Sequence, residues 1–119
     1  MNQIEYLDFH AGFCSEARRL AARKNDDYAG RKSSDAFRNF RLVEQMGHCS
    51  TEAGILTRLS DKLQRLVNVV RDGASVTDET ADDTLLDIIN YSTILAAVLQ
   101  EKRDAGREEF IVQCQNGGA

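Results

Sequence analysis

The chain has 119 residues, of which 29% are charged and 42% hydrophobic, and its formal net charge is −4. This length suits one domain, and the negative balance argues against electrostatic binding to bulk nucleic acid. The three cysteines stand far apart without a CxxC or Cys/His cluster, which argues against a zinc site and is typical of reduced thiols. No signal-peptide pattern and no membrane-length apolar run is present, so we expect a cytoplasmic protein without a membrane partner.

Apolar residues at spacings of three and four predict a first helix over residues 4–24. The polar stretch 24–30 ends in a glycine and predicts a loop. A second helix is expected to begin after a serine cap at Ser33 or Ser34 and to end near Gly47. Proline is absent from the chain, so no residue of that kind interrupts long helices.

The same periodicity predicts a third helix over residues 51–72 and a fourth over 78–103. Their short connection predicts an antiparallel hairpin. Residues 108–113 are apolar enough for a short strand or a helical turn, and 115–119 are expected to form a flexible tail. The predicted fold is all-α: a compact bundle of about four helices with the hairpin of helices three and four at its centre, in a single domain over residues 1–114.

The fourth predicted helix is the most informative about function, because it is apolar almost all round and yet carries aspartates. Such a helix is normally buried, and a monomer this small cannot cover it alone, so we expect a homo-oligomer. Asp83 and Asp87 lie one turn apart on this helix. Buried carboxylates are costly and need partners, either a metal ion or basic side chains.

The third predicted helix supplies such partners. Three cations share one of its faces: Arg58, Lys62 and Arg65. If this face meets the carboxylates, one interpretation is a set of inter-helix salt bridges that hold the bundle together. The other is a polar pocket in which Asp83 and Asp87 hold Mg²⁺ while the cations bind phosphate oxygens.

Three residues nearer the N-terminus are further candidates, each with a structural alternative. Lys24, with Asp27, either closes the pocket or belongs to an exposed loop pair of little energetic value. Tyr28 either stacks on a base or covers the helix ends. Asn39 has the amide that reads a base edge, or is an ordinary exposed helix residue.

Four motifs together carry a resemblance to a known family. They are Lys24-x-x-Asp27-Tyr28, Asp35-Ala36-Phe37-x-Asn39-Phe40, Arg58-x-x-Asp61-Lys62-x-x-Arg65 and Asp83-Thr84-Leu85-Leu86-Asp87-x-x-Asn90-Tyr91. Over residues 24–95 this combination resembles the nucleotide-modification-associated domain family, small helical proteins of phages and their bacterial relatives. The resemblance implies a phage origin, a place in the host cytoplasm and a link to nucleotide metabolism.

A more distant similarity is to the MazG-like, all-α nucleoside triphosphate pyrophosphatases, in which two antiparallel helices each supply a pair of acids that bind magnesium. Asp83 and Asp87 resemble the second pair. Of the first pair Asp61 is present, but Arg58 stands where another acid is expected. A site with fewer acids and more cations favours holding a nucleotide over cutting it.

From these observations we expect a phage-type protein that holds a phosphorylated nucleotide in a pocket between helices and sequesters a nucleotide signal of host defence. The expected nucleotide-binding residues are Lys24, Tyr28, Asn39, Arg58, Lys62 and Arg65, and the expected Mg²⁺ ligands are Asp61, Asp83 and Asp87. The alternative is a magnesium-dependent nucleoside triphosphate pyrophosphatase that uses the same acids. A purely structural helical assembly is the third interpretation.

Overall fold

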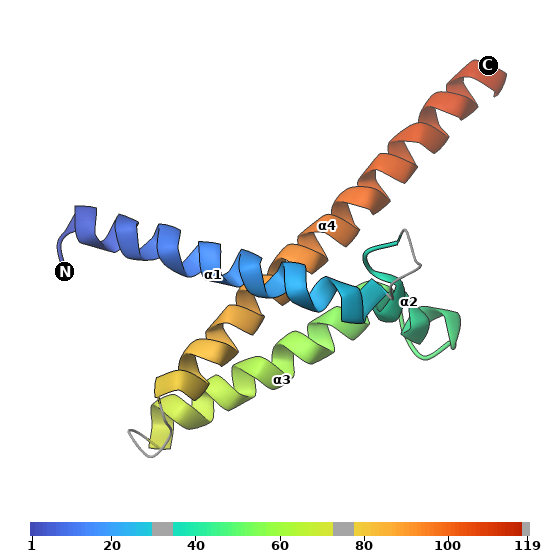
Figure 1. Cartoon of the computed structure of the whole chain (residues 1–119). Helices are drawn as coiled ribbons and strands as arrows, with labels where there is room; N and C mark the ends of the chain where they lie inside the picture. The colour runs from blue at the N-terminus through green and yellow to red at the C-terminus, as the bar shows by residue number, and fades with distance from the viewer. Residues whose placement is uncertain (30–34, 73–77, 118–119) are drawn as a thin grey trace.

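The computed structural model describes residues 1–29, 35–72 and 78–117, and this part of the chain is all-α (Figure 1). Its four helices are α1 (Gln3–Ala29), α2 (Arg38–Gln45), α3 (Thr51–Asp72) and α4 (Asp78–Gly117). The antiparallel hairpin of α3 and α4 is confirmed, and these two helices pack on each other more extensively than any other pair. No described helix has the length and apolar character needed to cross a membrane.

Two helices are longer than the sequence predicts. α1 continues to Ala29 through the stretch expected to be a loop, and α4 continues to Gly117 rather than ending at Arg103. The segment 108–113 is therefore neither a strand nor an isolated turn, and the expected tail begins inside a helix. Seven of the nine residues in 101–109 are charged, and a mixed-charge helix supports itself through side-chain pairs one turn apart.

The start of α2 also differs from the prediction. Its N-cap is Phe37, which makes no side-chain capping hydrogen bond, and the serine caps expected at Ser33 or Ser34 fall outside the described residues. Asp35 instead accepts a hydrogen bond of 3.0 Å from the backbone N–H of Phe37. The expected end of this helix near Gly47 is confirmed, because Gly47 has a φ of 79°, a left-handed conformation that suits glycine.

The core lies where α2, α3 and the middle of α4 meet. Its buried centre consists of Phe40, Ile55 and Val98, one from each helix. The ring of Phe40 meets Tyr91 of α4 edge-on, with centroids 6.2 Å apart. α2 is too short to be stable alone, so burial of Phe40 is what holds it on the hairpin.

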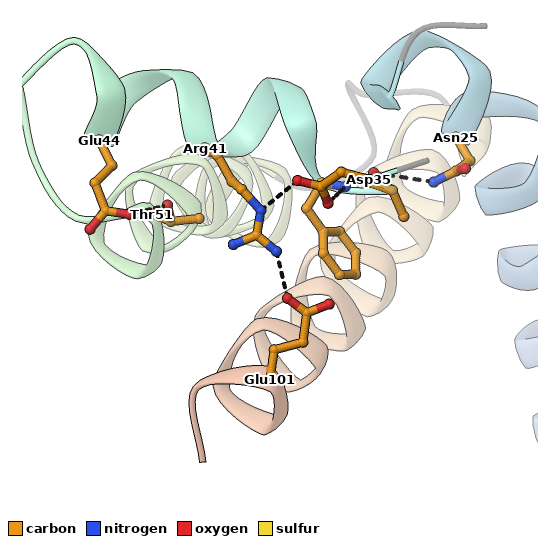
Figure 2. Close-up of polar contacts among 8 residues, drawn as sticks. Asn25, Asp35, Arg41, Glu44, Thr51 and Glu101 are labelled. Carbon is orange, nitrogen blue, oxygen red and sulfur yellow. Dashed lines mark hydrogen bonds and ion pairs between the residues drawn. The ribbon is translucent and has the colours of Figure 1, made fainter. Parts of the chain in front are cut away.

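Polar contacts around Arg41 fasten α2 to its neighbours (Figure 2). The Arg41 guanidinium donates to Asp35 at 2.7 Å and to Glu101 of α4. At the other end of α2, the Thr51 hydroxyl donates to Glu44 at 2.8 Å. These contacts fix the orientation of α2 and, with it, the direction in which Phe40 points.

α3 passes close to α2 at Gly54. A Cβ at this position would lie 2.8 Å from Cγ2 of Val43, and a β-branched side chain has little freedom to turn away. We expect Gly54→Ala to destabilise the fold by about 1 kcal/mol. The matched control is Gly106→Ala in α4, where nothing lies within 4 Å of the new Cβ and a gain of up to about 1 kcal/mol is expected. Urea unfolding measures both, and equal gains would show that the close approach imposes no constraint.

Candidate functional site

Asp87 is the point at which three helices meet through charged side chains. Lys24 of α1 lies 3.0 Å from Oδ1 of Asp87, and Lys62 of α3 lies 2.8 Å from Oδ2. The Asp87 side chain is 16% exposed, that of Lys62 20% and that of Lys24 36%. The centre therefore holds two cations for one carboxylate, and it is partly screened from water.

Buried residues on the same helices place the two lysines. Lys24 follows the buried Ala17 by seven residues, and Lys62 follows the buried Ile55 by seven. Seven residues are two helical turns, so each lysine continues the side of its helix that faces the core. Asp87 lies on α4, where it meets both lysines.

The two lysines decide the protonation state of Asp87. Burial by itself raises the pKa of this carboxyl group, but hydrogen bonds from Lys62 and Lys24, together with their positive charges, outweigh that effect. The pKa of Asp87 therefore lies below its ordinary value. The group is a carboxylate at neutral pH, and it holds both ammonium groups in place.

Arg58 adds a third cation one turn before Lys62 on α3. Its guanidinium carbon lies 4.6 Å from the ring centroid of Phe40, which is within the range of a cation–π interaction. The ring that supports Arg58 is itself 2% exposed. The core thus fixes this cation in place.

The other predicted site residues lie in different surroundings. Asp61, Arg65 and Asp83 are exposed, and Asn39 is partly buried on α2. Tyr28 lies within α1, but its side chain falls outside the described part of the structure. Within residues 1–25, 35–72 and 81–117, no group of three His, Cys, Asp or Glu side chains could hold a metal ion, so the ligand set of Asp61, Asp83 and Asp87 stays a prediction.

Asn90 is a site feature that the sequence does not assign. It follows Asp87 by three residues, is 8% exposed, and its amide nitrogen Nδ2 has no hydrogen-bond partner. A buried amide without a partner is unusual and costs free energy. The available signal was its position as a polar residue within an apolar run, one turn from the carboxylate.

The fold and site together define an all-α chain with a lysine-rich charged centre where α1, α3 and α4 meet. No family model, curated protein or solved structure matches this chain. The resemblances to the nucleotide-modification-associated domain family and to the MazG-like pyrophosphatases therefore stay predictions from the sequence motifs.

Proposed function

We propose that this chain binds a phosphorylated nucleotide, with the phosphates at the charged centre formed by Lys24, Lys62 and Asp87. The observation that carries the proposal is the convergence of two lysines from different helices on one carboxylate. Two ammonium groups leave a surplus positive charge, and Arg58 adds to it one turn away on α3. A phosphate group takes up that surplus through charge-assisted hydrogen bonds.

The balance of charges favours holding a nucleotide over hydrolysing it. Metal-assisted hydrolysis needs carboxylates that are free to coordinate magnesium. Asp87 is already engaged by two lysines. Asp61 and Asp83 are exposed, and within the described residues they belong to no group of three acidic, His or Cys side chains that could hold the ion. Magnesium carried by the nucleotide itself is compatible with this site. We therefore place the pyrophosphatase activity second.

The biological role follows from the resemblance together with the proposed binding. In a phage setting, a protein that binds a nucleotide without turning it over removes that nucleotide from the host cytoplasm. A nucleotide signal of host defence is the ligand for which such removal benefits a phage. Asn39, partly buried on α2, is the proposed contact to the base.

We also propose that the chain works as a homo-oligomer. Among the α4 side chains from residue 81 to 117, only a few are fully buried within the single chain, and Ile88, Ile89, Ile94 and Leu95 are each half-buried. A helix that is apolar on all sides is stable when other helices cover those sides. A second copy supplies such helices.

Nucleotide binding is tested with a panel of mono-, di- and triphosphates, linear and cyclic, measured by thermal shift and calorimetry with and without magnesium. We expect at least one nucleotide to raise the melting temperature. Lys62→Met should weaken its binding about 10- to 100-fold, because a hydrogen bond to a charged group contributes about 1.5–3 kcal/mol. The matched control is Lys102→Met on α4, where the lysine side chain is 72% exposed.

Two results would contradict the proposal. One is a panel in which no nucleotide shifts the melting temperature. The other is equal affinity for the wild-type chain and Lys62→Met. Chromatography of the nucleotide after incubation with the protein distinguishes binding from hydrolysis. Release of pyrophosphate that depends on magnesium and is lost in Asp87→Asn would favour the pyrophosphatase.

A further inference from the structure

Asn90 interrupts a buried apolar stripe of α4. Four residues at spacings of four follow one side of this helix: Leu86, Asn90, Ile94 and Val98. Leu86 is 6%, Asn90 8% and Val98 3% exposed. Val98 belongs to the core, and Ile94 packs against it. An apolar side chain at position 90 would continue the stripe, whereas an amide at a buried position costs free energy unless it is hydrogen-bonded.

The amide nitrogen of Asn90 lacks that hydrogen bond. Its Nδ2 atom is buried and has no partner within the described part of the chain. Such an atom is rare, because buried side-chain polar atoms nearly always pair with the protein or with an ordered water. The nitrogen of an asparagine amide carries two N–H donors. The group that completes this site is therefore a hydrogen-bond acceptor.

The charged centre lies one turn before this nitrogen. Asp87 precedes Asn90 by about 4.5 Å along the helix axis and about 60° around it, so the two side chains are neighbours on one side of α4. The ammonium groups of Lys24 and Lys62 lie 3.0 and 2.8 Å from the Asp87 carboxylate. An ammonium group has three N–H donors, and its contact with one carboxylate oxygen uses one of them. Donors from α1, α3 and α4 therefore lie close together.

We propose that Asn90 binds the ligand of the charged centre, its Nδ2 donating a hydrogen bond to an oxygen of the phosphate that Lys24 and Lys62 hold. This inference rests on the proposed nucleotide binding and adds a donor from the third helix. The phosphate reaches Nδ2 when the lysine side chains move toward the anion, which their flexible four-carbon stems allow.

Burial of Nδ2 makes this hydrogen bond more valuable than one at the surface. A typical hydrogen bond contributes little net free energy, because each group gives up bonds to water when it forms. Nδ2 is already shielded from bulk water, so the protein has paid for its desolvation on folding. The consequence is a trade-off, in which the amide lowers the stability of the chain alone and raises its affinity for the nucleotide.

Asn90→Leu tests the trade-off, because leucine has the branching of asparagine without its polar atoms. Without nucleotide, its melting temperature should lie about 3–6 °C above that of the wild type. The tightest-binding nucleotide of the panel of mono-, di- and triphosphates should bind about 10- to 100-fold more weakly by calorimetry. The matched control is Asn68→Leu on α3, where the asparagine is exposed and the affinity should stay unchanged.

Nuclear magnetic resonance of the wild-type chain gives a second readout that needs no variant. The side-chain amide protons of Asn90 should shift downfield when that nucleotide is added, because they become hydrogen-bonded to an anion. The amide protons of Asn68 should not move. This readout keeps the inference testable if Asn90→Leu does not fold.

Three results would overturn the inference while wild-type binding leaves the proposed function intact. The first is equal nucleotide affinity for the wild type and Asn90→Leu. The second is an Asn90 amide signal that the nucleotide does not shift. The third is a lower melting temperature for Asn90→Leu, which would show that an ordered water satisfies the amide within the fold. A wild-type chain that binds no nucleotide removes both proposals.

Discussion

Phe40→Ala should lower the free energy of unfolding by about 3–5 kcal/mol, which is the usual cost of removing a buried phenylalanine ring. Phe40 is 2% exposed and fills the junction of Ile55 and Val98, so the truncated side chain leaves a cavity that three helices would have to close. The loss is a large part of the 5–15 kcal/mol, roughly, that stabilises a domain. Urea unfolding followed by circular dichroism measures it.

The control for this prediction is Phe110→Ala. Phe110 lies on the distal part of α4 and is 66% exposed, so its truncation should change the stability by no more than about 0.5 kcal/mol. Phe40→Leu keeps an apolar side chain and should lose less than Phe40→Ala. A loss below about 1 kcal/mol for Phe40→Ala would show that α2 is not docked on the core.

Asp87→Asn should destabilise the chain at neutral pH by about 1–3 kcal/mol, because Lys24 and Lys62 lose their shared counter-charge. The pKa of Asp87 in the folded chain lies below the ordinary 3.8. The unfolded chain therefore takes up this proton first as the pH falls, and the carboxylate's contribution to stability is lost through that range. The stability difference between wild type and Asp87→Asn should be complete well above pH 3.8 and shrink below it.

Unfolding curves at pH 7 and at about pH 3 test this expectation, since the difference between two chains cancels the titration of shared groups. Asp83→Asn is the matched control, because Asp83 lies one turn away on the same helix and is exposed. If the difference in unfolding free energy between wild type and Asp87→Asn does not change with pH, the ion pairs of Asp87 contribute nothing to folding.

The same variant separates the two proposed activities. If the lysines bind phosphate, removing the carboxylate that occupies them should leave nucleotide affinity the same or increase it. If Asp87 coordinates magnesium, its loss should weaken magnesium-dependent binding. Calorimetry of wild type and Asp87→Asn with the tightest-binding nucleotide of the panel shows whether the affinity rises or falls.

The sequence by itself determined the helices and the central hairpin. Local periodicity is enough for this, because the apolar stripes of residues 51–72 and 78–103 recur at the helical spacing whatever packs against them. The prediction that α4 ends at Arg103 was wrong, because the stretch that follows continues the helix although it is exposed and mixed in charge. A helix with no buried face leaves no periodic pattern to detect, yet it forms where most residues are good helix formers, even with a glycine such as Gly106 inside it.

The tertiary structure alone decided which charged residues meet. Asp83 and Asp87 lie close together on the helical wheel, so spacing could not tell which one faces the other helices. Likewise, the prediction that a carboxylate of α4 meets cations of α3 holds for Lys62, while Arg58 lies on Phe40. That Lys24 completes the centre depends on the angle at which α1 crosses α4, because contacts between distant segments follow from packing in three dimensions and not from local periodicity.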